Sequence, residues 1–514
     1  MLVKTIGASL YGMNAIGIQV EVNISMGQGY CIVGLPDIAV KESLHRTEIA
    51  IKANGFKMPR TKLVINLAPA DIKKTGPAFD LPIAIGILAA SEQISLSNVL
   101  SKYLMMGELS LGGTLQPIKG VLAMAIYAKE AGLDGIIIPR INAPEASLIE
   151  GLDVFGFDHL TEVTHFCNYP NEIHPYKAPV LGSAEIVKEY ELDFAAIKGQ
   201  YQAKRAIEIA AAGGHNIIMV GPPGAGKTML AKTSISILPE MSIAETLETS
   251  KVYSLLGKLP ANFALMQTRP FRSPHHSLSA IALVGGGSIP QPGEISMAHN
   301  GILFLDELPE FSRVAIEILR QPMEDGIVCV SRARQTIEFP SRFMLFASMN
   351  PCPCGYFNHP KKACTCSPSN VQKYLHKISG PLLDRIDLQI EVVPVNYEVL
   401  TSPATIENSA TIKKRVMQAR LVQKNRFSDR PEINTNAQMQ PKDLLNWAQI
   451  DKDTALLLKV AMEKFHLSAR AHDRIIKVAR TIADLEGLKN IQNQHISEAI
   501  QYRTLDRASW GQSF

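Results

Sequence analysis

Residues 216–228, NIIMVGPPGAGKT, decide the fold of the central part of this chain. The apolar residues 217–220 predict a buried strand, and the periodicity of residues 229–237 predicts a helix after it. Between them lies the pattern G-x-x-x-x-G-K-T, whose glycines let backbone N–H groups turn toward a chain of phosphates. The helix N-terminus adds a favourable dipole for the same anion. A glycine-rich turn with a surface lysine that arises by chance rarely has a strand before it and a helix after it. The stretch therefore predicts a nucleotide-binding α/β domain.

The ligands that this loop predicts are ATP and Mg²⁺. We expect Lys227 to reach the β- and γ-phosphates and the Thr228 hydroxyl to hold Mg²⁺. Further upstream, Gln200 precedes a helical pattern and is predicted to line the adenine pocket. The predicted nucleotide-binding residues of the loop itself are Gly221, Pro222, Pro223, Gly224, Ala225, Gly226, Lys227 and Thr228.

Two further apolar runs end in polar residues that suit phosphoryl chemistry. Residues 301–307, GILFLDE, predict a strand that ends in Asp306 and Glu307. Asp306 is predicted to hold Mg²⁺ and Glu307 to polarise the attacking water. Residues 343–350 predict another strand, and Asn350 at its end resembles sensor 1 of AAA+ ATPases, where an amide orients the water. An acid pair or an asparagine at a strand end is weak evidence alone, and the preceding phosphate loop strengthens it.

Two arginines occupy positions that resemble AAA+ arginines acting on the γ-phosphate. Arg385 lies in GPLLDRIDL, and by this resemblance it reaches the nucleotide of a neighbouring subunit. The alternative is a surface ion-pair cluster of Asp384, Arg385 and Asp387. Arg470 opens a C-terminal helical pattern and resembles a sensor-2 arginine. A helix start disfavours a cation, which argues for a functional reason.

The composition describes a globular protein of several domains. The chain has 514 residues, of which 46% are hydrophobic, and a net charge of +4, which neither requires nor excludes a nucleic acid partner. We find no apolar run of about 18 residues and therefore expect no transmembrane span and no membrane partner. The N-terminal stretch lacks a secretory cleavage pattern, and the seven cysteines do not resemble a disulfide framework. The expected compartment is the cytoplasm.

Strand and helix patterns alternate in the first part of the chain, and two motifs there resemble the proteolytic domain of Lon proteases. They are KTGPA, residues 74–78, and LQPIKG, residues 115–120. The Lon nucleophilic serine corresponds to Ala78 and the activating lysine to Leu122, so the resemblance implies a Lon-like fold without a peptidase dyad. Lys74 and Asp80 are interpreted as ordinary loop and cap charges.

We therefore predict a multidomain α/β protein in four segments. Residues 1–165 form a Lon-like α+β domain, and residues 166–190 form a proline-containing linker. Residues 191–395 form an AAA+ P-loop core, in which a glycine- and proline-rich helix-2 insert precedes the acid pair. Residues 396–514 form a helical C-terminal lid that carries Arg470.

Four cysteines fall within fifteen residues, in two C-x-C pairs. Four thiolates at this spacing can close a tetrahedral Zn²⁺ site that staples the loop after Asn350. Reduced structural thiols and an iron–sulfur cluster are the alternatives. The predicted zinc ligands are Cys352, Cys354, Cys364 and Cys366.

Residues 326–339 predict two strands joined by a basic turn, which corresponds to a pre-sensor-1 hairpin. In a ring such a hairpin points into the pore, where Arg332 and Arg334 would grip DNA phosphates without reading bases. The alternative is an ordinary solvated hairpin tip. No helix-turn-helix or aromatic RNA-binding pattern accompanies it.

Residues 269–310, the CPCG segment and GPLLDRIDL together closely resemble the bacterial YifB/ComM family of magnesium chelatase-like AAA+ proteins. The resemblance covers essentially the whole chain. It implies a homo-hexameric DNA helicase, in single or stacked rings, that acts on single-stranded and branched DNA. Such a helicase promotes branch migration during homologous recombination in natural transformation, with the recombination machinery as a possible partner.

Three other functions are compatible with the same ATPase motifs. A chelatase-type motor would insert Mg²⁺ into a porphyrin, but the Lon-like domain argues against it. An ATP-dependent unfoldase is also compatible, because protein unfolding does not need the peptidase dyad. An ATP-switched clamp would hold DNA without moving it.

Overall fold

The structure of the protein is a computed structural model. It describes residues 1–95, 98–177, 192–259, 265–287, 290–332, 335–357, 359, 361–395, 407–430 and 432–503. Of these, a first compact unit holds 1–177, 243–259, 265–267 and 335–338, and a second holds 192–242, 268–332 and 339–503. Within the described ranges no helix combines the length and apolar character needed to cross a bilayer.

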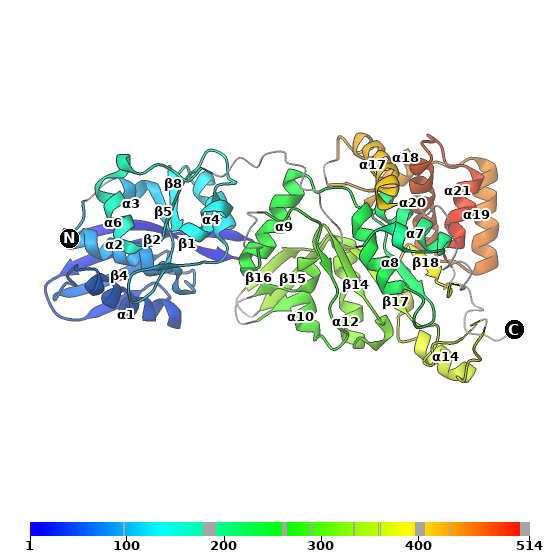
Figure 1. Cartoon of the computed structure of the whole chain (residues 1–514), viewed down its shortest axis with the longest axis horizontal. Helices are drawn as coiled ribbons and strands as arrows, with labels where there is room; N and C mark the ends of the chain where they lie inside the picture. The colour runs from blue at the N-terminus through cyan, green and yellow to red at the C-terminus, as the bar shows by residue number, and fades with distance from the viewer. Residues whose placement is uncertain are drawn as a thin grey trace. The chain divides into compact units, whose positions relative to one another are not determined.

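A seven-stranded mixed sheet forms the core of the first unit, in the order β3-β4-β2-β1-β5-β8-β9 (Figure 1). β1 pairs antiparallel with β2, and β2 pairs antiparallel with β4, whereas the other neighbours run parallel. The strands are β1 (Leu2–Tyr11), β2 (Asn14–Ser25), β3 (Tyr30–Val33), β4 (Lys62–Ala68), β5 (Tyr103–Met105), β8 (Gly135–Pro139) and β9 (Asp153–Phe157). A small separate pair consists of β6 (Glu108–Leu109) and β7 (Leu115–Gln116).

The central helix of this unit is α2 (Asp80–Ala90), whose eleven residues are all buried. It is apolar along almost its whole length, as a helix covered on every side should be. It packs on β1, β2 and α1, and a Cβ at Gly86 would come within 2.6 Å of Val22, so the glycine permits this close approach. The other helices of the domain are α1 (Ile38–Ala53), α3 (Val99–Lys102), α4 (Val121–Glu130), α5 (Ala143–Ala146) and α6 (Leu160–Asn168).

Two charged residues that the sequence suggested as loop and cap charges are buried, and that interpretation is wrong. The Asp80 carboxylate accepts hydrogen bonds of 2.8 and 3.0 Å from the Arg46 guanidinium and one of 3.1 Å from the Leu109 N–H. The Lys74 ammonium is fully buried and donates to the carbonyl of Pro69. Burial raises the pKa of Asp80, and the hydrogen bonds from Arg46 oppose that rise.

A helix from the middle of the sequence completes the first unit. α9 (Ile243–Leu256) packs on α4, and the Gly120 N–H donates to the Ser254 carbonyl at 3.0 Å. The Ser254 hydroxyl donates to the buried Glu145 carboxylate, which also accepts from the Leu122 N–H at 2.9 Å. The predicted domain boundaries had assigned this helix to the ATPase core.

The second unit is built on a five-stranded parallel sheet in the order β11-β14-β17-β10-β18. This order makes β17 central, with β14 and β10 as its neighbours. The carboxyl ends of β10, β14 and β17 therefore meet at one edge, where ligands of open α/β sheets bind. The strands are β10 (Ile217–Val220), β11 (Phe271–Arg272), β14 (Ile302–Leu305), β17 (Met344–Met349) and β18 (Leu388–Glu391).

Short helices and strands occupy the segments in which the sequence predicts an insert and a hairpin. The insert contains α10 (Ala280–Val284), a short antiparallel pair of β12 (Gly285–Gly286) and β13 (Gln291–Pro292), and α11 (Glu294–Met297). β15 (Ile327–Arg332) and β16 (Gln335–Pro340) form a two-stranded sheet of their own.

The C-terminal helices belong to the same compact unit as the parallel sheet. The predicted helices at 410–424 and 471–485 are confirmed as α17 and α20, whereas the helix after the phosphate loop ends at Thr233 and continues as a 3₁₀ turn to Ile237. The helices of the unit are α7 (Tyr201–Gly213), α8 (Lys227–Thr233), α12 (Arg313–Ile318), α13 (Arg320–Asp325), α14 (Pro368–Leu375), α15 (Gly380–Leu383), α17 (Ser409–Arg426), α18 (Pro441–Trp447), α19 (Lys452–Phe465), α20 (Ala469–Leu485) and α21 (Asn493–Gln501).

Arg46→Ala tests the buried charge pair of the first unit. The change leaves the Asp80 carboxylate buried without its cation, so the free energy of unfolding of this unit should fall by about 3–5 kcal/mol. Denaturant unfolding measures the change. The control Lys102→Ala removes an exposed ion pair with Asp134 and should cost about 1 kcal/mol or less. Equal losses in the two variants would contradict the interpretation.

Candidate active site

The phosphate loop lies between the end of β10 and the start of α8. Gly224 and Gly226 have φ values of 78° and 87°, which favour glycine, and they turn the loop as its sequence predicts. The Lys227 ammonium is buried and donates to the carbonyls of Gly221 (2.6 Å) and Pro222 (3.0 Å). Burial lowers the pKa of Lys227, while Asp306 and Glu307 act in the opposite direction.

The residues expected to hold Mg²⁺ come together in the structure. The Thr228 hydroxyl donates to the Asp306 carboxylate at 2.9 Å, although the two residues lie 78 positions apart in sequence. A hydroxyl and a carboxylate oxygen in direct contact fit the two-residue Mg²⁺ site of P-loop ATPases. Ser348 on β17 also donates its hydroxyl to Asp306 and fixes the orientation of the carboxylate.

Asn350 and Glu307 lie at the same edge of the sheet. The Asn350 side-chain oxygen accepts a hydrogen bond of 3.2 Å from the Lys227 ammonium. Glu307 has a left-handed backbone with φ 52°, and its carboxylate is half exposed. The His276 imidazole lies 3.7 Å from that carboxylate. The edge thus gathers a cation, a metal-binding pair, an amide and an exposed acid, which is the chemistry that ATP hydrolysis requires.

Ser348 and His276 were not predicted as site residues. Ser348 could have been found, because alternation along a strand puts residues 348 and 350 on the same side. His276 is 31 positions before Glu307, and no sequence pattern links the two.

Gln200 is next to the phosphate loop, as expected, but its amide is engaged with backbone. It donates to the carbonyls of Ala225 (3.2 Å) and Val393 (2.6 Å) and so ties the loop to the chain after β18. Contact of Gln200 with adenine stays a prediction.

Arg385 is buried within its own chain. Its guanidinium forms an ion pair of 2.6 Å with Glu324 and donates to the Pro381 carbonyl at 2.6 Å. The alternative of a surface cluster with Asp384 and Asp387 is wrong, because Arg385 is only 5% exposed and pairs with neither. A role in a neighbouring subunit's site therefore requires the pair with Glu324 to open.

Arg470 is exposed at the second position of α20. The Ser468 hydroxyl before it caps the helix and lies 3.4 Å from the Asp384 carboxylate. One turn after Arg470, Arg474 forms an ion pair of 2.9 Å with Asp387. The start of α20 is thus tied to the segment that contains Arg385.

Asp387 is the centre of a buried polar cluster that the sequence did not predict. Its carboxylate accepts from the Asn216 N–H at 2.9 Å and from Arg474, and the His215 imidazole lies 3.7 Å away. His215 also hydrogen bonds to Thr481 on α20 at 2.8 Å. Burial lowers the pKa of His215, against the effect of Asp387, so the imidazole is neutral near pH 7.

The four predicted zinc ligands lie together after β17, with all four sulfur atoms within 4.8 Å of one another. Cys352 lies 3.3 Å from Cys354 and 3.7 Å from Cys364, and Cys354 lies 3.6 Å from Cys364. Tetrahedral Zn–S bonds of about 2.3 Å separate sulfurs by about 3.8 Å, so the residues fit zinc. A Cβ at Gly355 would come within 2.7 Å of Pro223, which shows that this loop packs against the phosphate loop.

The predicted DNA contacts fall at the tip of the β15–β16 hairpin. Arg334 lies outside the described residues, and Arg332 ends β15 with a side chain that is likewise outside the description. Both contacts stay predictions.

The chain resembles known proteins along nearly its whole length. Residues 193–400 match the family described as magnesium chelatase, subunit ChlI, residues 20–142 match subunit ChlI of Mg-chelatase, and residues 406–503 match the ChlI C-terminal family. YifB of Salmonella typhimurium is 44% identical over 500 residues, 96% of each chain. Competence protein ComM of Haemophilus influenzae is 42% identical over 515 residues, 97% of this chain and 98% of ComM. Lon protease 2 of Bacillus subtilis is 28% identical over 192 residues, 33% of this chain and 34% of that protein.

The fold, the site and these matches define a magnesium chelatase-like ATPase of the AAA+ class, a class that uses ATP and Mg²⁺. Within that class, the chain belongs to the YifB/ComM family.

Zinc content tests the cysteine cluster. We expect about one zinc ion per chain by elemental analysis, lost in Cys364→Ala and retained in the control Cys31→Ala, because Cys31 is exposed and lies far from the cluster in sequence. Absence of metal, with the thiols of all four cluster cysteines reacting in addition to those outside the cluster, would establish the reduced-thiol alternative. Iron with visible charge-transfer absorption would establish the cluster alternative.

The pH dependence of stability in the variant His215→Gln tests the buried cluster around Asp387. The unfolded chain binds a proton at His215 below about pH 6.5, whereas the folded chain resists it, so this residue lowers the stability of the folded state as pH falls below that value. Charged Asp387, Arg474 and Lys477 face the imidazole, and only Asp387 favours its protonation. We expect the variant to lose less unfolding free energy than the wild type between pH 7 and pH 5. Parallel pH curves would contradict the prediction.

Proposed function

We propose that this protein is an ATP-driven, ring-forming DNA motor that promotes branch migration during homologous recombination in natural transformation. Its ring is a homo-hexamer, and its substrates are single-stranded and branched DNA. The observation that carries the proposal is the convergence of Lys227, Thr228, Asp306 and Asn350 at one sheet edge, in a chain similar to a competence protein over 97% of its length.

ATP is the substrate that this edge accommodates. The turned backbone of the loop and Lys227 bind the β- and γ-phosphates. Thr228 and Asp306 hold Mg²⁺, which neutralises charge that develops on the phosphate oxygens. Glu307 orients and polarises the attacking water from its exposed position, and Asn350 fixes the water or the γ-phosphate.

Two arginines connect hydrolysis to the ring and the lid. Arg385 leaves Glu324 and enters the site of the neighbouring subunit, where a guanidinium offsets transition-state charge. Arg470, exposed at the start of α20, reaches the nucleotide from the lid. The contacts of Ser468 and Arg474 with the Arg385 segment support this coupling, since a lid movement pulls directly on that segment.

The DNA strand is gripped at the ring pore by Arg332 and Arg334. Such contacts bind phosphates and confer no base specificity, which suits a motor that must pass any sequence.

ATP-dependent protein remodelling is a second candidate, and the partial similarity to Lon protease 2 favours it. Ala78 at the position of the Lon serine argues against proteolysis, although unfolding would not need the serine. A chelatase-type motor is a third, supported by the family match alone.

The test is branch migration on three- and four-stranded DNA substrates with ATP and Mg²⁺. We expect ATP-dependent strand movement by the wild type and its loss in Glu307→Gln, with ATP turnover reduced by about 100-fold or more because the water loses its polarising carboxylate. The control Glu463→Gln alters an exposed acid on α19 and should behave as the wild type.

Three other outcomes would favour a different function. Tight DNA binding without strand movement would establish the clamp. ATP turnover without DNA binding would overturn the DNA motor and direct the same assay to unfolded proteins. Porphyrin metallation would establish the chelatase.

A further inference from the structure

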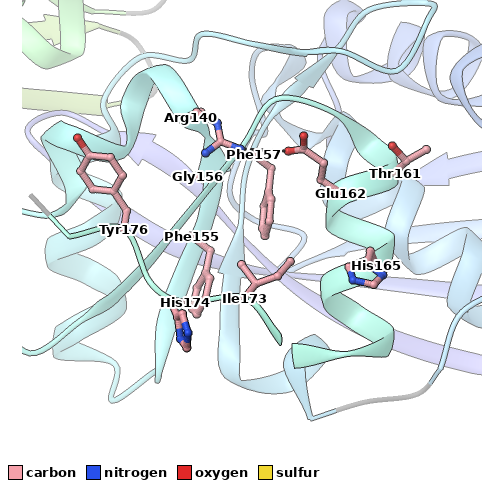
Figure 2. A pocket seen from close by; sticks show the side chains of 10 residues that line it. All are labelled: Arg140, Phe155, Gly156, Phe157, Thr161, Glu162, His165, Ile173, His174 and Tyr176. Atoms are coloured by element: carbon pink, nitrogen blue, oxygen red, sulfur yellow. Dashed lines mark hydrogen bonds and ion pairs between the residues drawn. The ribbon is translucent and has the colours of Figure 1, made fainter. Parts of the chain in front are cut away.

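Two cavities of similar volume differ in how their charges are balanced. The first, of about 380 Å³, lies in the first unit beside β9 and α6 (Figure 2). Its Arg140 pairs with Asp158 at 2.5 Å and with Glu162 at 3.4 Å, and its His165 lies 3.0 Å from Glu172. Each of these basic groups already has an acidic partner, so the cavity offers an anion no excess of positive charge.

The second cavity, of about 410 Å³, lies in the second unit between the chain after Glu307 and α14. One wall carries Glu310 and Arg313, and the other carries Lys373, His376 and Lys377. Its arginine, two lysines and one glutamate give a formal net charge of +2. This cavity is therefore basic in a chain whose total net charge is only +4.

Two of the three cations are available to a ligand. Lys377 lies 3.3 Å from Glu310 in an exposed ion pair, which water screens strongly. Among the residues that the structure describes, neither Arg313 nor Lys373 lies within salt-bridge distance of a carboxylate, and both are exposed. Such a cavity suits phosphate oxygens, and its volume falls within the range of ligand sites, about 300–1,000 Å³.

Both walls are connected to the catalytic edge. Glu310 ends the 3₁₀ turn Leu308–Glu310, which directly follows Glu307. On the other wall, Tyr374 of α14 is buried, and α14 is connected to Asn350 by the cysteine loop, which follows Asn350 directly. A ligand that draws the walls together therefore acts on the acid that polarises water and on the amide that senses phosphate.

The cysteine loop supports the second wall. α14 begins directly after Cys366, and Ser367 caps it by accepting from the Asn370 N–H at 3.3 Å. The position of Lys373 thus depends on a loop that also packs on Pro223 of the phosphate loop.

We propose that this basic cavity binds the sugar–phosphate backbone of a DNA strand and transmits its occupancy to Glu307 and Asn350, so that DNA controls ATP hydrolysis. The inference rests on the proposed DNA function and adds a second DNA contact, outside the β15–β16 hairpin. The competing occupant is an acidic surface of a second copy of this chain, and the test distinguishes it.

The experiment measures binding of a fluorescein-labelled oligo(dT) strand by anisotropy over a range of salt concentrations, and ATP turnover with and without that strand. Arg313→Gln/Lys373→Gln removes two phosphate contacts. The slope of log affinity against log salt should decrease in magnitude by about 1.4, at about 0.7 per contact with single strands. We expect affinity to fall about 10-fold and the stimulation of ATP turnover by DNA to be lost.

Two further variants make the result specific. Glu310→Gln raises the cavity charge and should tighten DNA binding, which keeps the test valid if the double variant fails to fold. Lys452→Gln/Lys459→Gln removes two exposed charges from α19 and should leave the salt slope, the affinity and the stimulation unchanged.

The outcomes separate the two proposals. The cavity proposal would be overturned if the wild type binds DNA and the double variant has the same affinity, salt slope and stimulation of ATP turnover. The proposal of a DNA motor would then still stand. If the double variant binds DNA normally but no longer assembles into oligomers in analytical sedimentation, the cavity is a contact surface for a second copy of the chain. A wild type that does not bind the strand would overturn both.

Discussion

The second unit depends on one buried carboxylate, that of Asp387. A charge without exposure to water is tolerated only when it is paired and hydrogen-bonded, and Asp387 satisfies this through Arg474 and the Asn216 N–H, beside His215. Asp387 lies in the segment just after Arg385, and its partners come from two other places: the start of the strand that leads into the phosphate loop, and the helix α20. Through Arg474 and the Asn216 N–H, Asp387 holds the start of β10, the segment that contains Arg385 and the helix α20 in one arrangement. Loss of the carboxylate would release all three, because each of these contacts uses it.

The cysteine loop has a similar role at the opposite end of the strands. It leaves β17 just after Asn350, packs Gly355 against Pro223 of the phosphate loop, and leads into α14. A metal ion there would stabilise the nucleotide site from outside without touching the nucleotide. The basic cavity follows from the same geometry, because α14 buries Tyr374 and exposes Lys373, which lines the cavity.

Much of this site could be predicted from local sequence, for a physical reason. In a parallel sheet the residues that follow adjacent strands meet at one edge, so finding the strands that end in GPPGAGK, Asp306 and Asn350 was enough to bring these groups together. Burial of charge was not predictable in this way. Asp80 and Lys74 resemble loop charges because their partners, Arg46 and the Pro69 carbonyl, are revealed only by the tertiary structure. The burial of Arg385 could not be predicted for the same reason, since nothing in GPLLDRIDL indicates Glu324, 61 positions earlier.

The position of α9 has a consequence for how the protein is made. The Lon-like unit is complete only when residues 243–259 and 265–267 join it, because without them the Gly120 N–H and the Glu145 carboxylate lack Ser254. From residue 177 to residue 267 the ribosome must add 90 residues, which takes about 5–18 s at about 5–20 residues per second. During this interval the surface of α4 that contacts α9 is uncovered, so the phosphate loop is synthesised before the first domain can close. The order of synthesis therefore delays completion of the first unit until α9 has been made, and an N-terminal fragment ending at residue 177 would be an unfinished domain.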